Sequence, residues 1–380
     1  MDTSQRMVWL DALRLTAGVS MVVLHATADP NGQPWVNYPP ADRVGPIVIR
    51  TIIYSARTEL FLIISAFLLL LALEHRPRSY GQTVRQQMRR LLLPFAFWVV
   101  FYAGYNLIKA DAFGYTPALL GQLSNPMEWV GFFVLGDIKY HMHFLPTLFG
   151  LVLFFPLFKC ARRWPAIGFG VLVCLLVKRE LDGFLWSAFV DTQALPYLVR
   201  AVKILTYVGY GLIAGAALGI LEKSSTKQRE AWLPILGFAA TLLILVKSVG
   251  AWKTVQLGAW PHSYTAGFWA DFLMPALLFL FCMCCGHWRW PAVISRIAPY
   301  SFGIYLCHPI FLDLAEVALR DVGWAPVMQV LVKLSFALPA TTFLVIMLSR
   351  SVLFAWVVGL GPLPTLRRVS TNEQERQNAA

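Results

Sequence analysis

The sequence has little charge for its length. Charged residues make up 14% of the 380 residues, whereas 58% are hydrophobic and the mean hydropathy is +0.60. A soluble domain carries charge on about a quarter of its residues. This composition excludes a disordered chain, a collagen-like chain and an ordinary soluble enzyme. Long apolar runs indicate instead a protein embedded in a lipid bilayer.

Acidic residues are scarcer than basic ones, and cysteines are few. There are 20 Asp and Glu against 32 Lys and Arg, which gives a formal net charge of +12. In a membrane protein such an excess belongs in the cytoplasmic loops, so we expect no nucleic-acid partner. None of the six cysteines shows the spacing of a zinc site. We therefore expect neither a metal centre nor a disulfide framework.

Ten apolar segments predict an all-α integral membrane protein with about ten transmembrane helices. They cover residues 7–28, 47–73, 91–109, 144–158, 165–178, 202–221, 232–248, 265–286, 299–319 and 327–358. We assign 1–365 to one transmembrane domain and 366–380 to a short polar cytoplasmic tail. The last segment exceeds one span, so we expect it to tilt, kink or end along the interface. Residues 126–136 are too short to cross and suit a re-entrant or interfacial piece.

The distribution of basic residues predicts the orientation. Excess Arg and Lys falls on alternate connections, namely 74–90, 159–164, 222–231, 287–298 and the tail. The intervening connections 110–143 and 179–201 are nearly balanced. The positive-inside rule therefore predicts that both termini are cytoplasmic. Alternatively, the first 28 residues are a signal peptide cleaved after Ala26-Thr27-Ala28, which leaves nine spans in the same orientation.

Ionisable residues in the first span are candidates for chemistry because charge inside a membrane is costly. Arg14 and His25 are eleven residues apart, close to three helical turns, so they share one face about 16 Å apart along the axis. Arg14 lies in the cytoplasmic half and His25 near the outer surface. The alternative is a snorkelling arginine and an interfacial histidine.

The second span adds Arg57 and Glu59, and Arg76-Pro77-Arg78 follows it. Glu59 could orient His25 and increase its basicity, or simply neutralise Arg57. Two guanidinium groups flanking a proline suit bidentate contact with phosphate. They can equally be ordinary positive-inside charge.

Three further histidines stand out. His141 and His143 precede the fourth span, and their spacing places both on one side of an extended segment, as substrate contacts rather than metal ligands. His308 lies in the ninth span before Pro309, which removes a helical hydrogen bond and can kink the helix. The alternative for His308 is a buried structural histidine.

Together these motifs resemble the membrane acyltransferase 3 family. The resemblance rests on Arg14 with His25, on Glu59-Leu60-Phe61 with Ser65-Ala66-Phe67, on Arg76 with Arg78, on His141 with Phe144-Leu145, and on Tyr300, Ser301, Gly303, Ile304, Tyr305, His308 and Pro309. It spans nearly the whole chain. Ala66 stands where the family typically has Gly, and His143 where it has Trp.

The resemblance implies transfer of an acyl group from cytoplasmic acyl-CoA to a hydroxyl of a cell-envelope or exported polysaccharide, in a bacterial inner membrane. Acetyl-CoA is the expected donor and succinyl-CoA the alternative. His25 would act as general base, helped by Arg14 and Glu59. Arg76, Arg78 and Arg14 would bind the donor. The acceptor contacts would be His141, His143, Arg57 and His308. The glycan, the oligomeric state and the choice between direct transfer and an acyl-enzyme stay open.

The competing class is a proton-coupled transporter of a small molecule or glycan precursor, because buried His, Arg and Glu also suit proton relays. A third hypothesis is an acyltransferase-like scaffold without catalysis. Binding of acyl-CoA would separate an enzyme from a transporter.

Overall fold

The computed structural model describes residues 7–261 and 263–363, and within these ranges the chain is all-α. The polar tail predicted at 366–380 lies outside the described residues. The long helices are α1 (Val8–Ala26), α2 (Pro40–Ile53), α3 (Thr58–His75), α4 (Tyr80–Phe113), α9 (Gly170–Ala188), α10 (Leu195–Lys223), α12 (Leu233–Leu257), α13 (Thr265–Cys284), α15 (Ser301–Leu319) and α16 (Pro326–Arg350). The short ones are η1 (Tyr54–Ala56), α5 (Thr116–Ser124), α6 (Pro126–Val134), α7 (Phe144–Val152), α8 (Phe155–Arg163), η2 (Pro165–Phe169), α11 (Thr226–Glu230), α14 (Val293–Ile297), η3 (Ala298–Tyr300) and η4 (Ala355–Val358).

The helices confirm a multi-pass membrane protein, whereas the count of ten spans is not confirmed. Eight helical segments of the described chain are long and apolar enough to cross a bilayer. The fourth predicted span is a broken helix, with α7 and α8 bent by 61°, and would make nine. The fifth predicted span falls in η2 and α9, where charged residues cluster in the second half of the helix: Lys178, Arg179, Glu180 and Asp182. The last span ends at Arg350, and η4 follows it as a separate short helix.

The second span is interrupted at Arg57. This residue has an extended backbone (φ −66°, ψ −179°) between η1 and α3, where the sequence predicted one continuous helix. The break leaves the Ala56 carbonyl without a helical donor. The Ser20 hydroxyl of α1 donates to it at 2.6 Å. A buried polar group from a neighbouring helix thus satisfies the broken backbone, as a helix break inside a membrane requires.

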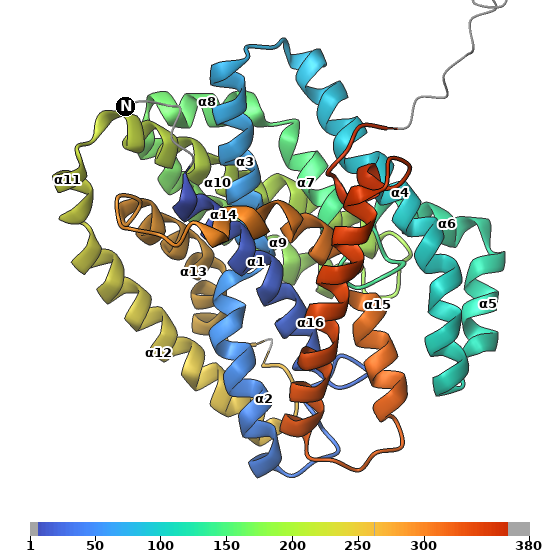
Figure 1. Ribbon diagram of the computed structural model, residues 1–380. Coiled ribbons are helices and arrows are strands. Elements are labelled where there is room, and N and C mark those ends of the chain that lie inside the picture. Colours follow the sequence, from blue (N-terminus) through green and yellow to red (C-terminus); the bar gives the residue numbers. More distant parts are fainter. Residues whose placement is uncertain (1–6, 262, 364–380) are drawn as a thin grey trace, which may run out of the picture.

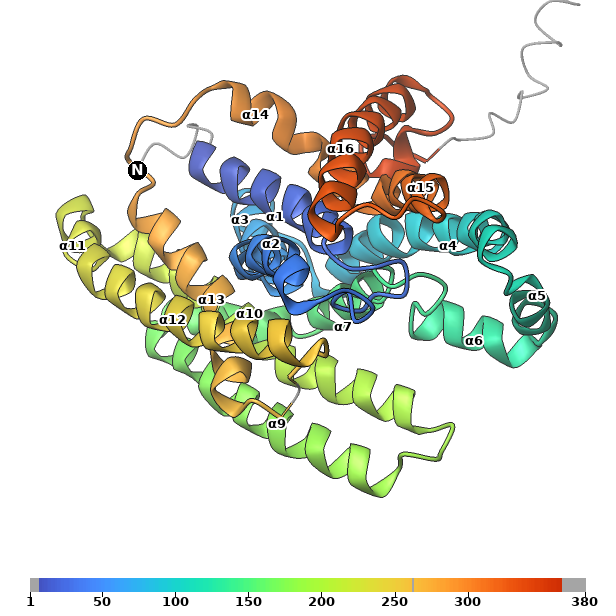
Figure 2. The ribbon, with the colours of Figure 1, turned by 90° about the horizontal axis from the view of Figure 1, so that it is seen from below.

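Helix α1 occupies the centre of the bundle. It contacts α2, α3, α13, α15 and α16, which surround it in Figure 2. Helices α9 and α10 pack together on one side, while α5 and α6 extend from α4 at the opposite edge. The α3–α4 connection and the α15–α16 connection lie at opposite ends of the molecule (Figure 1).

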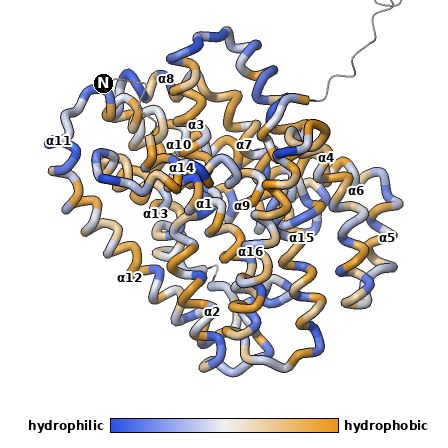
Figure 3. Tube along the Cα trace, viewed as in Figure 1, coloured by the Kyte–Doolittle hydropathy of each residue, from blue (hydrophilic) through white to orange (hydrophobic). Residues whose placement is uncertain are grey.

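The basic connections gather at one end. Arg162 of α8 pairs with Glu74 at the end of α3 and, at 2.9 Å, with Glu222 at the end of α10. His287 lies 2.8 Å from Glu230, which joins the remaining basic connection to the same end. Figure 3 shows the hydrophilic turn above α3 standing clear of the hydrophobic tube. All four internal basic loops therefore lie at the same end of the helix bundle, as predicted. That this end faces the cytoplasm stays a prediction.

The bent α7–α8 pair is held by a close approach to α10. Glycines repeat every fourth residue along α10, and a Cβ at Gly215 would lie 2.1 Å from the Phe158 carbonyl oxygen. At Gly219 it would lie 2.0 Å from the carbonyl oxygen of Arg162. Small residues of this kind allow helix backbones to approach closely within a membrane. The sequence of α10 thereby lets α8 turn across it instead of continuing the line of α7.

Candidate active site

Three histidines from separate parts of the chain meet at the C-terminal end of α1. His25 comes from the last turn of α1, His308 from α15, and His141 from the connection before α7. Ring centroids are 5.5 Å apart for His25 and His308 and 5.1 Å for His141 and His308. Tyr140 lies against His25 at 4.0 Å. We call His25, His141 and His308 the histidine cluster.

The histidine cluster carries nitrogen atoms without hydrogen-bond partners. The Nε2 atoms of His25 and His308 and both ring nitrogens of His141 are buried and have no partner among the described residues. Buried polar atoms in folded proteins are nearly always paired, so unpaired ones at one place mark a site where another molecule binds. His25 is only half-buried, whereas the other two rings are almost fully enclosed.

The tautomer of His308 follows from its neighbour in the sequence. Pro309 has no N–H, so the Tyr305 carbonyl four residues earlier loses its helical donor. The Nδ1 of His308 lies 2.7 Å from that oxygen. Because a carbonyl oxygen only accepts, Nδ1 carries the hydrogen, and Nε2 of the neutral ring keeps a free lone pair. The helix continues through Pro309 to Leu319.

His141 and His143 do not share one face, which corrects the prediction of an extended segment. The chain turns here, with Met142 N–H donating to the Lys139 carbonyl at 2.9 Å and Phe144 N–H to the His141 carbonyl at 3.2 Å. His141 packs against Tyr305 and His308, whereas the His143 carbonyl accepts from Arg200 of α10 at 2.9 Å. Burial, followed by the nearby His308, lowers the pKa of His141, which precedes the α7 span. His141 is therefore a neutral member of the cluster.

Gly136 makes this turn possible. Its φ is +76°, and a Cβ would lie 2.6 Å from the His143 backbone nitrogen. A side chain there would be strained and would clash with the backbone. The glycine thus lets the connection fold back tightly and fixes where the following histidines lie.

A buried ion-pair network holds the elements of the histidine cluster together. Asp313 and Glu316 on α15 accept from three lysines on three different segments. Lys139 lies 2.5 Å from Asp313, and Lys109 of α4 lies 2.5 Å from Glu316 and 3.4 Å from Asp313. Lys333 of α16 lies 3.5 Å from Glu316. Lys139 directly precedes Tyr140 and His141, so the network fixes that segment against α15.

Glu59 does not orient His25, which corrects a second prediction. Its Oε2 lies 3.1 Å from Arg57 Nε, and its Oε1 accepts from the Tyr207 hydroxyl of α10 at 2.7 Å. Glu59 begins α3 and belongs to the contact between that helix and α10. Arg57 stacks over Tyr54 and Phe272, at 4.3 Å and 4.4 Å from the ring centroids. The structure therefore supports mutual neutralisation, the other alternative for this pair.

Arg14 lines a second site nearer the basic loops. A cavity of about 130 Å³ lies between α1, α3, α4, α7 and α15, and its polar lining includes Arg14, Gln87, Arg90 and Ser301. Arg14 also lies 3.5 Å from Asp11, which accepts from Ser295 at 2.8 Å. We call this space the arginine cavity.

The Arg76-Pro77-Arg78 segment follows α3, whose last turns line the arginine cavity up to Ala72. Arg76 is exposed and its backbone N–H donates to the Ala72 carbonyl. Arg78 is half-buried and donates to Gln86 on α4. Arg78 therefore contacts the residue next to Gln87, which lines the arginine cavity, whereas neither arginine lines the cavity itself.

An aromatic layer separates the arginine cavity from the histidine cluster. Phe61 and Phe144 line the cavity, and both rings contact Tyr305 with centroids 5.7 Å and 5.4 Å apart. Tyr305 in turn contacts His141 and His308 at 5.3 Å and 6.1 Å. The hydroxyl of Tyr305 donates to the His141 carbonyl, which fixes the ring. We call Phe61, Phe144 and Tyr305 the aromatic layer.

Among the described residues no group of three or more His, Cys, Asp or Glu side chains has an arrangement that could hold a metal ion. The six cysteines are free.

The model of the acyltransferase 3 family, described as an acyltransferase domain, matches residues 7–358. The chain belongs to the membrane acyltransferase 3 family. The match confirms the resemblance drawn from the motifs and identifies an acyltransferase. No curated protein and no solved structure matches the chain.

Several members of this acyltransferase's sites were not singled out from the sequence. Arg90 was counted with the basic residues of the 74–90 connection that set the membrane orientation. No pattern in the sequence distinguishes Tyr140 from the other tyrosines. The buried lysines did carry a signal, because Lys247 and Lys333 interrupt apolar segments where charge is rare. Their carboxylate partners lie on other helices, and helical spacing cannot identify those.

Proposed function

We propose that this acyltransferase moves a short acyl group from acyl-CoA, bound beside the basic loops, to a hydroxyl group of a saccharide on the opposite side of the membrane. The observation that supports this proposal is the course of α1. One end of this helix contributes Arg14 to the arginine cavity, and the other contributes His25 to the histidine cluster. A single rigid element thereby links a cationic donor site to an unpaired base.

The donor phosphates would bind Arg76 and Arg78, because guanidinium groups match phosphate oxygens in geometry and charge. The pantetheine arm would then enter the arginine cavity between α3 and α4. A space of about 130 Å³ has room for an acetyl or succinyl group. Acetyl fits the apolar part of the lining, and the carboxylate of a succinyl group would find Arg14 or Arg90.

The transfer step would use His25 as general base. The acceptor oxygen attacks the thioester carbonyl carbon, and its proton passes to the free Nε2 of His25. The C–O bond forms, the C–S bond breaks, and the proton passes on to the departing thiolate, which leaves as CoA-SH. Such a base contributes about 10²- to 10⁴-fold to the rate. Arg14, about 16 Å from His25 along α1, would hold the donor in the arginine cavity and would not contact the oxyanion that forms beside His25.

Neutral His308 and His141 would position His25 and the acceptor hydroxyl. Arg57 lies farther from the histidine cluster, at the α2–α3 break, and His143 lies toward α10. They would contact the saccharide at a distance from the reacting hydroxyl. We further propose a bacterial inner membrane as the location and a cell-envelope or exported polysaccharide as the acceptor.

The rival hypotheses predict different ligands. A proton-coupled transporter has no use for acyl-CoA, and a scaffold would bind it without transfer. The deciding experiment compares incorporation of labelled acyl groups into the envelope glycans of a deletion strain. The strain is complemented with the wild type, His25→Ala, the double variant Arg76→Ala/Arg78→Ala, or the control Arg85→Ala/Arg89→Ala, which removes two exposed arginines from the neighbouring helix. Membrane levels are matched by immunoblot.

We expect label with the wild type and the control, none with His25→Ala, and at least about tenfold less with the Arg76/Arg78 variant, because each charge-assisted phosphate contact contributes about 1.5–3 kcal/mol. Full labelling with His25→Ala would remove His25 as the base. No label from the wild type, with no acetyl-CoA or succinyl-CoA binding by the purified protein, would favour the transporter.

A further inference from the structure

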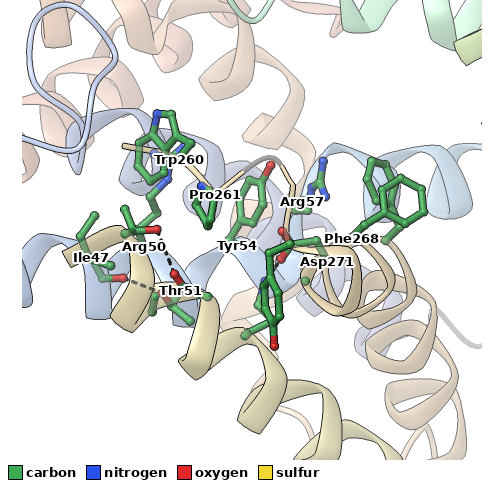
Figure 4. A pocket seen from close by; sticks show the side chains of 16 residues that line it. Ile47, Arg50, Thr51, Tyr54, Arg57, Trp260, Pro261, Phe268 and Asp271 are labelled. Atoms are coloured by element: carbon green, nitrogen blue, oxygen red, sulfur yellow. Dashed lines mark hydrogen bonds and ion pairs between the residues drawn. The ribbon is translucent and has the colours of Figure 1, made fainter. Parts of the chain in front are cut away.

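A larger cavity lies away from both sites described so far. It has a volume of about 430 Å³ and is enclosed by the end of α2, η1, the second half of α12 and the start of α13. Its lining contains the cations Arg50, Arg57 and Lys247 and the aromatic residues Tyr54 and Trp260. Figure 4 shows Trp260 next to Arg50 and Tyr54 between the two arginines. No member of the histidine cluster lines it.

The charges of this cavity are not balanced. Arg57 is neutralised by Glu59, and Lys247 pairs with Asp271. Arg50 makes no ion pair with a carboxylate of the described residues. Its Nη1 donates to the Leu24 carbonyl at 2.8 Å, and the guanidinium stacks on Trp260 at 4.3 Å from the ring centroid. A half-buried cation without an anion is costly, so the cavity is prepared for an anionic ligand.

An apolar groove continues from this cavity onto the outer face of the helices. The groove has a volume of about 350 Å³ and lies between α2 and α12. It shares four lining residues with the cationic cavity: Ile47, Thr51, Lys247 and Ala251. The rest of its lining is mainly exposed and apolar and includes Val44, Val48, Ile52, Ile244 and Trp252. Both helices belong to membrane-spanning segments, so the groove faces hydrocarbon.

We propose that the cavity and groove bind one phosphate-bearing lipid, with its phosphate on the Arg50 guanidinium and its hydrocarbon chain along the α2–α12 groove. The charge of Arg50 and the apolar lining beside it each match one part of such a molecule. A soluble anion would leave the groove unused, and a neutral lipid would leave Arg50 without a partner. Guanidinium groups bind phosphate in a bidentate manner, and the stacked Trp260 holds this one in place.

Arg50 also connects this site to the histidine cluster. It donates to the carbonyl of Leu24, the residue directly before His25. A saccharide attached to the lipid phosphate would therefore start beside the base. That the lipid is the anchor of the acceptor rests on the proposed function, whereas binding of the phosphate to Arg50 does not.

The test measures lipid binding to the purified full-length protein in phosphatidylcholine nanodiscs, without acyl-CoA. The probes are a polyprenyl phosphate and phosphatidylglycerol, and the uncharged polyprenol is the matched neutral probe. The variants are Arg50→Gln, Arg50→Lys and Ser248→Trp, which places a ring in the groove only. Lys253→Gln is the control, because it removes an exposed cation on the same part of α12 that lines neither space.

We expect the polyprenyl phosphate to bind and the polyprenol not to bind. Arg50→Gln should weaken binding about 10- to 100-fold, the equivalent of a lost charge-assisted hydrogen bond, and Arg50→Lys should weaken it less. Ser248→Trp should weaken binding of the long-chain polyprenyl phosphate. Added inorganic phosphate should compete with this probe to the same extent in Ser248→Trp and in the wild type. Lys253→Gln should bind like the wild type.

Equal binding of polyprenol and polyprenyl phosphate, or unchanged binding by a correctly folded Arg50→Gln, would overturn the proposal. Preference for phosphatidylglycerol over the polyprenyl phosphate would keep the phosphate site but assign it to a bilayer lipid instead of an acceptor anchor. Acyl transfer is measured separately, as label in the envelope glycans of the complemented strain, because the binding test contains neither acyl-CoA nor a saccharide acceptor. Transfer without Arg50-dependent binding would overturn this inference alone, and binding without transfer would overturn the proposed function alone.

Discussion

The Nδ1 of His308 lies 2.7 Å from the carbonyl oxygen of Tyr305, the one oxygen of α15 that Pro309 deprives of its helical donor. The imidazole takes the place of the missing N–H. In doing so it fixes which ring nitrogen bears hydrogen and leaves the other free beside His25. The adjacent residues His308 and Pro309 thus determine that the hydrogen of the His308 ring is on Nδ1.

Pro309→Ala should separate helix stability from activity. The alanine would supply an N–H to the Tyr305 carbonyl and compete with His308 for it. We expect the melting temperature to stay equal or rise, while acyl transfer falls several-fold because His308 loses its fixed tautomer. Thermal unfolding in detergent and the transfer rate measure the two effects. An unchanged rate would show that the tautomer of His308 has no part in transfer.

Asp313 should be important for stability because it faces two lysines in the interior. Asp313→Asn leaves Lys109 and Lys139 short of a counter-charge, and removing one partner of a buried pair costs about 3–5 kcal/mol. Denaturant or thermal unfolding would measure this loss. The matched control is Asp321→Asn, because Asp321 pairs with Arg320 at the exposed end of the same helix, where an ion pair contributes about 0–1 kcal/mol. Equal effects of the two variants would contradict the network.

The aromatic layer should keep water from the histidine cluster away from a donor thioester that waits in the arginine cavity. Phe61→Leu reduces the layer while preserving an apolar side chain, so we expect acyl-CoA hydrolysis without acceptor to increase. The release of free CoA measures it. Phe133→Leu on α6 is the control, because that ring is exposed. If neither variant hydrolyses acyl-CoA faster than the wild type, Phe61 does not separate the two sites.

Glu59→Gln should destabilise the protein without moving the pH dependence of transfer. The substitution leaves Arg57 without its anion and weakens the contact with Tyr207. A carboxylate bonded to His25 would make the imidazole more basic, and its loss would shift the acidic limb of the profile to lower pH. We expect the limb to stay in place. A shift to lower pH would restore the direct role of Glu59 at His25.

The structure brings several of the residues singled out by the motifs together, but the motifs did not predict how those residues meet. Arg14, His25 and His308 were identified because charged or titratable groups in apolar segments are rare, and helical spacing placed the first two at opposite ends of one helix. The meeting of His25, His141 and His308 depends on the packing of three separate segments. Periodicity within one helix carries no information about its neighbours.

Local chemistry explains two of the expectations that the structure corrects. His141 and His143 were read as an extended pair, but Gly136 allows a tight turn that spacing alone does not reveal. Glu59 was considered for His25 because both belong to outer halves of adjacent spans. The break at Arg57 turns the start of α3 toward α10, where Tyr207 competes for the carboxylate.

The aromatic layer has a further consequence for the cell. A protein that transfers a chemical group across a bilayer must not let ions leak through the membrane. Each elementary charge that crosses a potential of 100 mV dissipates about 2.3 kcal/mol. Phe61, Phe144 and Tyr305 contact one another between the arginine cavity and the histidine cluster. In the proposed orientation of the two sites, these rings would be the apolar barrier across which most of the membrane voltage falls.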